Sequence, residues 1–138
     1  MSVEKIPENI RKYLKKQNIE ELRPSQEKSI EKGLFENNHN QIVCSPTASG
    51  KTFVAELAML DVLLNKKKKV LYIVPLKALA AEKFKDFKQY YGEDFNIRIS
   101  VGDLQSETYN YEFDILIVTS EKLDSLIRHD KKILDGIG

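Results

Sequence analysis

The sequence predicts an α/β fold built on a mainly parallel sheet. Short apolar runs alternate along the chain with longer segments that have helical periodicity. The runs at residues 70–74 and 115–118 are apolar throughout, which is typical of strands covered by helices on both faces. Alternating strands and helices favour parallel strands joined by right-handed crossovers. We therefore expect a sheet with helices on both of its faces.

Two helices are expected to come first. The first helix has apolar residues at helical spacing, namely Ile6, Ile10, Tyr13 and Leu14. Residues 18–21 form a connection, and Pro24 then suits the first turn of a second helix. Ile30 and Leu34 would form the apolar stripe of that second helix.

A phosphate-binding loop is the strongest local signal. The sequence Ser-Pro-Thr-Ala-Ser-Gly-Lys-Thr occupies residues 45–52, between an apolar run at 41–44 and a helical pattern at 50–64. A strand, a tight loop and a helix in this order are the context that such a loop requires. Ser45 stands where the usual pattern has Gly, so we interpret the loop as a variant. In the helix we expect the inward side chains to be Ala55, Met59, Val62 and Leu63.

Each residue of the loop has an expected role in binding a nucleoside triphosphate. Backbone N–H groups and the positive end of the helix dipole would hold phosphate oxygens, and Gly50 would allow a close approach. Lys51 would place its ammonium between the β- and γ-phosphates, and Thr52 would ligate Mg²⁺. We expect Lys51 and Thr52 to be catalytic. The residues expected to contact the nucleotide are Pro46, Thr47, Ala48, Ser49, Gly50, Lys51 and Thr52.

Further strands are expected at residues 70–74, 97–101 and 115–118, with helices at 78–91 and 121–127. Polar or glycine-containing segments follow these strands, at residues 75–77, 102–103 and 119–121. Ligands bind at the carboxyl ends of parallel strands. We therefore expect these segments and the phosphate-binding loop to line one edge of the sheet.

Composition excludes several classes of protein. The formal net charge is +1, so any nucleic-acid site must be local. Cys44 is the sole cysteine, which excludes an internal disulfide and a cysteine-cluster metal site, and we expect it to be a small buried residue. No signal peptide or membrane-spanning run is visible. We expect a cytoplasmic protein with no membrane partner.

Five stretches together resemble superfamily 2 nucleic-acid helicases. They are Leu-Arg-Pro-Ser-Gln at 22–26, Pro-Thr-Ala-Ser-Gly-Lys-Thr at 46–52, Val-Pro-Leu-Lys-Ala-Leu-Ala at 74–80, Ser-Val-Gly-Asp at 100–103 and Val-Thr-Ser-Glu-Lys-Leu-Asp-Ser-Leu-Ile at 118–127. Their order and spacing look closest to the Ski-two-like branch and, within it, to archaeal fork-acting DNA helicases. The resemblance covers residues 19–130. It implies a three-layer RecA-like P-loop domain.

The resemblance also implies roles for residues outside the loop. Gln26 resembles the glutamine of the family's Q motif, whose amide can pair with an adenine edge and select ATP. Asn9 stands near the position where the DEAD-box version carries an aromatic residue. The residues that resemble strand-contacting motifs are Pro75, Lys77, Ala78, Gly102, Thr119, Ser120 and Glu121. Thr119 and Ser120 also suit a plain helix N-cap, which is compatible with phosphate binding.

The family next requires a strand that ends Asp-Glu-x-His, and this sequence is expected to be cut short before it. Asp114 precedes its strand and lies at the wrong end of the sheet for a metal, and the family gives Asp103 no metal role. We expect residues 1–138 to be the N-terminal portion of a first motor domain. Residues 1–40 would be a helical lead-in with the Q-like motif, and residues 41–138 the P-loop core.

The implied function is ATP binding and strand binding within an ATP-dependent 3′-to-5′ DNA helicase. ATP and Mg²⁺ would be its cofactors, and single-stranded or forked DNA and the remaining helicase domains its partners. RNA stays possible, because backbone contacts alone do not distinguish the two nucleic acids. We expect the 138-residue chain alone not to hydrolyse ATP.

Two alternatives stay open. One is a small self-contained P-loop phosphotransferase with Asp103 as its metal carboxylate. That enzyme needs an arginine-bearing lid, whereas the arginines here are dispersed, at Arg11, Arg23, Arg98 and Arg128. The other is a non-catalytic nucleic-acid-binding module, in which the intact Gly-Lys-Thr at 50–52 would have no use.

Overall fold

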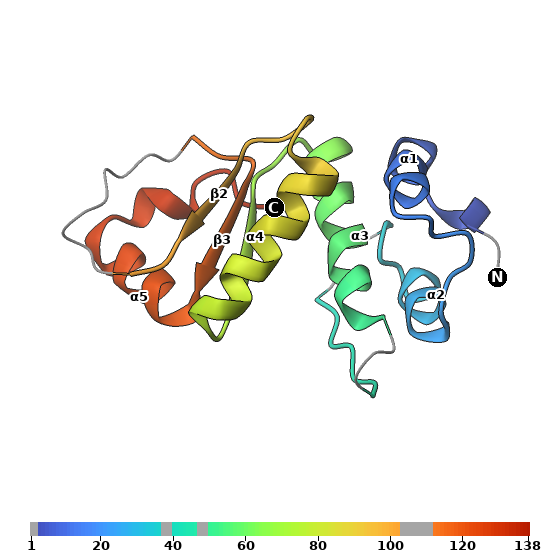
Figure 1. Ribbon diagram of the computed structural model, residues 1–138, viewed down its shortest axis with the longest axis horizontal. Coiled ribbons are helices and arrows are strands. Elements are labelled where there is room, and N and C mark those ends of the chain that lie inside the picture. Colours follow the sequence, from blue (N-terminus) through green and yellow to red (C-terminus); the bar gives the residue numbers. More distant parts are fainter. Residues whose placement is uncertain (1–2, 37–39, 47–49, 103–111) are drawn as a thin grey trace. The chain divides into compact units, whose positions relative to one another are not determined.

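The computed structural model describes residues 3–36, 40–46, 50–102 and 112–138 (Figure 1). The chain divides into two compact units, Met1–Lys67 and Lys68–Gly138, and each is described by itself. The division lies inside the range 41–138 that was expected to form one core. The expected domain organisation stays a prediction.

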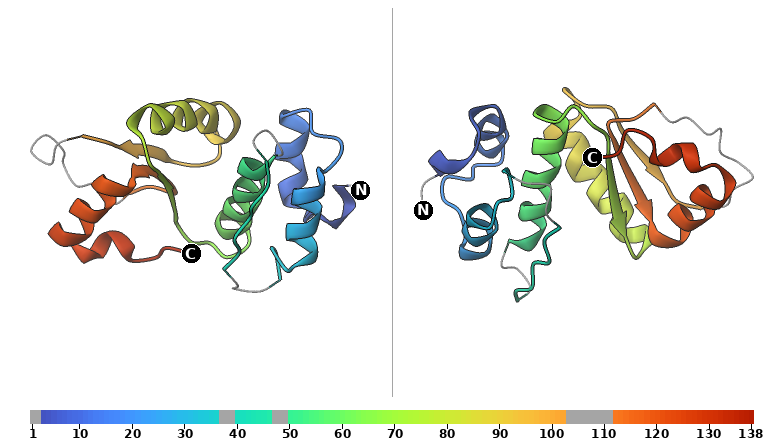
Figure 2. Two further views of the ribbon diagram at one scale, coloured as in Figure 1. Left: turned by 90° about the horizontal axis from the view of Figure 1, so that it is seen from below. Right: turned by 180° about the vertical axis from the view of Figure 1, so that it is seen from behind.

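The first unit is helical in its described part. Its elements are η1 (Val3–Lys5), α1 (Glu8–Lys16), α2 (Pro24–Glu31) and α3 (Lys51–Leu64). Both α1 and α2 contact α3, as the views of Figure 2 show. The apolar stripe predicted for the first helix is buried, with Ile10 and Tyr13 inaccessible to solvent. The two lead-in helices are therefore confirmed.

One expected strand is not formed. The described residues 40–46 have no strand geometry, Ile42 is 92% exposed and Cys44 is also exposed. The reason is that a strand requires a neighbouring backbone with which to exchange hydrogen bonds. All strands in the described part pair with one another within residues 70–119. The predictions of a strand at 41–44 and of a buried Cys44 are therefore wrong for this structure.

Helix α3 differs from expectation on one face. Met59 and Leu63 are buried as expected, whereas Ala55 is exposed and Val62 only half-buried. At about 100° per residue, positions two before and two after Ala55 point to nearly the opposite side of the helix. Phe53 and Leu57 occupy those positions and are buried. The larger side chains therefore take the core contacts, and the small alanine stays outside.

The second unit contains the sheet. Its elements are β1 (Val70–Val74), α4 (Lys77–Tyr91), β2 (Ile97–Ser100), β3 (Ile115–Thr119), α5 (Ser120–His129) and η3 (Lys131–Leu134). The strand order is β1-β3-β2, and both pairings are parallel. Val74 lies opposite Thr119, and Ser100 lies opposite Val118. The three later strands and the parallel sheet are confirmed, with ends shifted by one residue.

Three layers form around β3, whose residues are all buried. Side chains alternate between the two faces of a strand. Leu116 and Val118 pack with Leu126 of α5 and Ile133 of η3. On α4, Phe87 meets the ring of Tyr72 edge-on with 4.9 Å between centroids. Helices therefore cover both faces of the sheet, α4 on one and α5 on the other, as Figure 2 shows.

Candidate nucleotide and nucleic-acid sites

The start of α3 has features that suit a phosphate-binding site at a helix N-terminus. Gly50 is its N-cap, with φ of 86° in the left-handed region, and both Lys51 and Thr52 are exposed in the first turn. The first N–H groups of a helix have no partner within the helix, and the dipole makes this end positive. Among the expected loop residues, Pro46 is exposed, whereas Thr47, Ala48 and Ser49 lie outside the described residues.

Gln26 connects α2 to this helix start. Its side chain is buried, with 4% exposure, and its Nε2 donates to the carbonyl of Gly50 at 3.2 Å. Its Oε1 accepts from the backbone N of Arg23 at 2.9 Å, which closes a capping box at the start of α2. An amide has two N–H donors and two acceptor lone pairs, so one of each is left for an adenine edge.

Glycine at position 50 is required for space as well as for conformation. A Cβ there would lie 2.5 Å from Nε2 of Gln26 and 2.9 Å from Cδ of Arg23. Such approaches are shorter than real Cβ contacts, so a side chain at position 50 would displace Gln26. The start of α3 therefore has no room for a side chain at position 50.

A cavity of about 840 Å³ lies beside this helix start. Residues 17–21, Arg23, Gln26, residues 50–53 and Glu56 line it. Its volume lies in the range typical of small-ligand sites. Asn9 is not among the lining residues, and its side chain donates to Asn65 at 2.8 Å. The structure therefore places the Q-like motif and the helix start around one cavity within the first unit.

Sequence reasoning missed two parts of this cavity, the segment 17–21 and Glu56. Asn18 has φ of 54°, and the backbone N of Ile19 donates to the carbonyl of Leu14, which closes the end of α1. Asparagine after a helix end is a known signal of such a left-handed cap. That signal predicts the turn, whereas the position of Glu56 beside the cavity follows only from the packing of α3.

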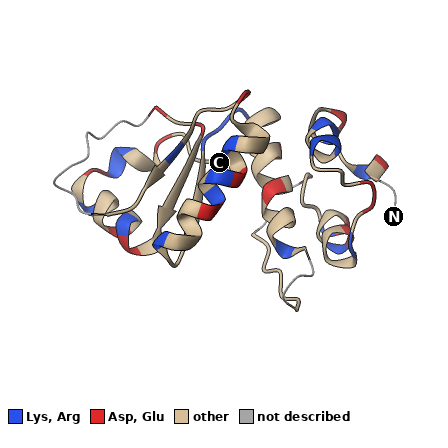
Figure 3. Ribbon diagram, in the orientation of Figure 1, with Lys and Arg blue, Asp and Glu red and all other residues tan. Residues whose placement is uncertain are grey.

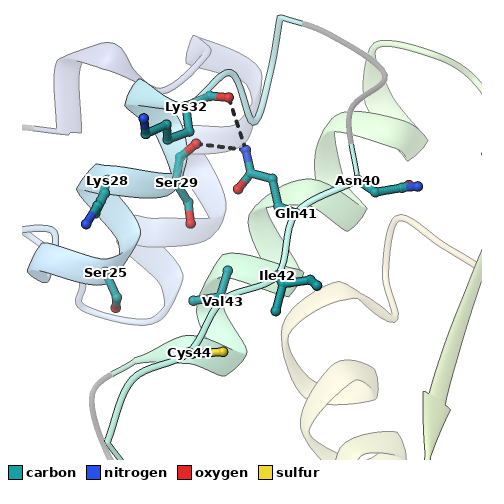
Figure 4. A pocket seen from close by; sticks show the side chains of 9 residues that line it. All are labelled: Ser25, Lys28, Ser29, Lys32, Asn40, Gln41, Ile42, Val43 and Cys44. Atoms are coloured by element: carbon teal, nitrogen blue, oxygen red, sulfur yellow. Dashed lines mark hydrogen bonds between the residues drawn. The ribbon is translucent and has the colours of Figure 1, made fainter.

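A second cavity, of about 540 Å³, lies between α2 and the irregular residues 40–44. Figure 4 shows Gln41 pointing back to α2, where its Nε2 donates to the carbonyls of Ser29 at 3.1 Å and Lys32 at 3.4 Å. Gln41 therefore adds a donor at the C-terminal end of α2, where the last carbonyls lack the helical partners of the interior and that of Ser29 also accepts from the backbone N of Leu34. The segment that was expected to pair in the sheet is instead attached to this helix.

The expected strand-contacting residues gather at one edge in the second unit. This carboxyl edge is the place where β1, β2 and β3 end, and parallel pairing brings those ends together. Pro75, Lys77 and Ala78 follow β1 and are exposed, and Lys77 begins α4. Gly102 follows β2 with φ of 117°. Ser120 and Glu121 are exposed in the first turn of α5.

Thr119 serves as the N-cap of α5. It is 7% exposed, and its Oγ1 accepts from the backbone N of Lys122 at 3.3 Å. The expectation that Thr119 suits an N-cap is confirmed, and its role in strand contact stays a prediction. Figure 3 shows basic and acidic residues interspersed on α4 and α5, so charge is not gathered on either helix.

Removing the cap is expected to destabilise the protein modestly. Thr119→Ala leaves the N–H of Lys122 without its side-chain acceptor, and loss of an N-cap typically costs about 1 kcal/mol. The free energy of unfolding, measured by urea denaturation, reports this loss. Thr119→Ser keeps the hydroxyl and serves as the control. Equal stability of the alanine and serine variants would contradict the capping role.

No acidic metal cluster stands at the carboxyl edge in the described part of the chain. Asp114 lies before β3, where its Oδ2 accepts from the backbone N of Asn96 at 2.7 Å. This places it at the amino end of the sheet, as expected. Asp103 lies outside the described residues. Across the described ranges, no three His, Cys, Asp or Glu side chains are close enough to hold a metal.

No helix in the described part of the chain combines the length and apolar character that crossing a bilayer requires.

Known proteins resemble this chain over most of its length. The DEAD/DEAH box helicase family matches residues 23–138. The ATP-dependent DNA helicase Hel308 of Methanococcus vannielii is 46% identical over 129 residues, 88% of this chain and 17% of that protein. Hel308 of Pyrococcus horikoshii is 43% identical over 126 residues, 91% of this chain and 18% of that protein. The DUF1998 helicase MrfA, solved with DNA and AMPPNP, has a TM-score of 0.75 at 26% identity over 97% of this chain and 20% of that chain. The chain spans less than a fifth of the length of these Hel308 relatives.

Proposed function

Because the chain belongs to the DEAD/DEAH box helicase family, we propose that it is the N-terminal portion of the first motor domain of an ATP-dependent DNA helicase. The rest of that motor domain would supply the Asp-Glu-x-His strand, and a second motor domain would complete the helicase. The observation that carries the proposal is the left-handed Gly50 at the start of α3, followed by exposed Lys51 and Thr52 and held by Gln26. We expect the whole protein to act on DNA in the cytoplasm.

In this proposal the cavity of the first unit receives ATP. The phosphates lie at the start of α3, where Lys51 neutralises their charge and Gly50 lets the backbone approach. Thr52 offers its hydroxyl to Mg²⁺, which when bound neutralises charge on the phosphates. The adenine lies toward Gln26, whose amide keeps one donor and one acceptor available.

The carboxyl edge of the second unit is proposed to grip a single DNA strand. Lys77 is an exposed cation at the start of α4, and the first turns of α4 and α5 present backbone N–H groups. Contacts of this kind hold phosphates and carry no base sequence. We therefore expect low sequence preference and strong salt dependence. ATP-driven closure of two motor domains would alternate this grip with a second one, moving the protein 3′ to 5′.

ATP hydrolysis with and without single-stranded DNA tests the proposal. The full-length helicase that contains this chain is expected to hydrolyse ATP with stimulation by DNA, whereas residues 1–138 alone are not. Catalysis needs charge stabilisation on all sides of the transferred phosphate, and the loop supplies only part of it. Turnover by the 138-residue chain alone would instead favour the small phosphotransferase.

The positions of the arginines disfavour that phosphotransferase. Arg11 donates to the carbonyls of Ile6 and Glu4, and Arg98 donates to the carbonyl of Glu112. Arg128 pairs with Asp124 one turn away on α5. Among the described residues that line the cavity, Arg23 is the sole arginine. An arginine-bearing lid over the phosphates is thus not supplied by the described part of the chain.

Substitution of Gln26 is expected to weaken selection of the base. In the full-length helicase, Gln26→Ala should lower ATP affinity about tenfold or more and reduce its preference over GTP, because a well-placed amide pair contributes ~1–3 kcal/mol of base discrimination. Competition of ATP and GTP for a fluorescent ATP analogue measures both effects. Gln41→Ala is the matched control, since it removes a part-buried amide hydrogen bond to α2 and Gln41 does not line this cavity. An unchanged ratio of ATP to GTP affinity in Gln26→Ala would refute the base-reading role.

A further inference from the structure

Lys122 is a buried lysine at the carboxyl edge that the strand-contacting set does not include. It lies in the first turn of α5 and is 4% exposed. Its Nζ donates to the carbonyl of Gly102 at 3.1 Å. Lysine is almost never fully buried unless it is paired, because an ammonium loses its hydration on burial. The bond to the carbonyl of Gly102 therefore helps to account for the burial of this lysine.

A direct contact between Lys122 and a nucleic-acid strand does not fit its geometry. The ammonium donates to a backbone carbonyl, and the residue as a whole is 4% exposed, which leaves little surface for a phosphate in solvent. Lys77, at the start of α4, is exposed and has the accessibility that phosphate contact requires. The two lysines lie at the same edge of the sheet but have different surroundings.

The hydrogen bond of Lys122 joins the segments that follow two neighbouring strands. Ser100 of β2 lies opposite Val118 of β3, and two residues beyond that pair are Gly102 and Ser120. The side chain of Lys122 therefore ties the turn after β2 to the first turn of α5. Both segments belong to the proposed strand grip.

Gly102 is a position where the backbone needs such a restraint. Its φ of 117° is one that side-chain-bearing residues rarely adopt, and among the described residues other than its chain neighbour no atom lies within 4 Å of where a Cβ would stand. The backbone conformation, and not crowding, therefore favours glycine at this position. Glycine by itself leaves the backbone free to rotate. A hydrogen bond from a charged donor is among the stronger ones, so it can fix the direction of this carbonyl.

We propose that Lys122 is a positioning residue that fixes the Gly102 turn against the N-terminus of α5 and so sets the spacing of two phosphate-gripping segments. The proposal rests on the proposed function of the carboxyl edge. Lys122 acts through the backbone of Gly102 and does not touch the strand. Its loss should lower strand affinity without removing a charge from the contact itself.

The test uses the full-length helicase and an oligothymidine strand. Lys122→Met keeps an unbranched side chain but removes the ammonium. We expect the DNA concentration for half-maximal ATPase stimulation to rise about tenfold, because the charge-assisted hydrogen bond to the carbonyl of Gly102 is lost. ATP turnover without DNA, and at saturating DNA, should stay unchanged. Lys131→Met removes an exposed lysine from η3 and is the matched control for loss of charge.

The salt dependence of DNA affinity separates positioning from contact. A lysine that neutralises a phosphate adds about 1 to the slope of log affinity against log salt. Lys77→Ala should therefore reduce that slope, whereas Lys122→Met should leave it unchanged. A reduced slope in Lys122→Met would overturn the proposal, as would an unchanged DNA requirement.

A second variant keeps the test decisive if Lys122→Met does not fold. Gly102→Ala strains the same backbone position, because its φ is 117°, and its Cβ would not crowd the described residues beyond its chain neighbour. It should raise the DNA requirement and leave the salt slope unchanged. Normal DNA affinity in Gly102→Ala would overturn the proposal. Failure of the proposed function is recognised separately, since the unmodified helicase would then show no stimulation by DNA.

Discussion

Lys51→Ala in the full-length helicase is expected to lower ATP turnover about a hundredfold to a thousandfold, because removal of one preorganised partner of a developing charge typically costs this much. Lys51 is exposed in the first turn of α3, directly after the left-handed Gly50. Lys51 and Arg23 are the only cations among the described residues that line the cavity. No nearby lysine in this lining can replace it.

The same variant should bind single-stranded DNA almost normally. The proposed strand grip lies at the carboxyl edge of the second unit, on residues distinct from the lining of the nucleotide cavity. Steady-state ATPase and fluorescence anisotropy with an oligothymidine strand measure the two properties separately. Lys28→Ala is the matched control, since it removes an exposed cation of α2 that does not line the cavity beside the start of α3. Loss of strand binding in Lys51→Ala would contradict the assigned roles.

The parts of the fold that the sequence predicts are those determined by local pattern. Strand β3 is a run of apolar residues, buried throughout, and α4 has its own helical periodicity and ends before Gly92. Gly92 is the C-cap of α4, where a Cβ would clash with the carbonyl of Lys88, and glycine after a periodic segment is a local signal of a helix end. Signals of this kind need no knowledge of distant residues.

The parts that the sequence does not predict depend on distant partners. Residues 41–44 are apolar enough for a strand, but strand formation depends on which backbone lies beside them, and here Gln41 bonds to α2 instead. The bond between Lys122 and Gly102 depends on the register of β2 against β3. Sequence patterns place both segments at one edge, and only the register shows that a buried lysine joins them.

Gly50→Ala is expected to abolish tight ATP binding while reducing stability only modestly. Alanine in the left-handed region costs about 1–2 kcal/mol. Its Cβ would also lie 2.5 Å from Nε2 of Gln26, which the backbone N of Arg23 holds at 2.9 Å through Oε1. Relief of the clash requires Gln26 to move, and both the helix start and the amide that we propose reads the base are then displaced. We expect ATP affinity to fall about a hundredfold or more, in line with one strongly misplaced group at a preorganised site.

Gly136→Ala is the control that separates backbone strain from displacement of Gln26 at the start of α3. Gly136 has φ of 77°, and the nearest atom to its Cβ position is Cδ of Lys69 at 3.9 Å, so alanine there is strained but not crowded. Both variants should lose a similar free energy of unfolding in urea denaturation. Only Gly50→Ala should lose ATP affinity in calorimetric titration of the full-length helicase. If both variants bound ATP normally, the phosphates would have to lie away from Gly50, and the nucleotide site proposed at the start of α3 would be wrong.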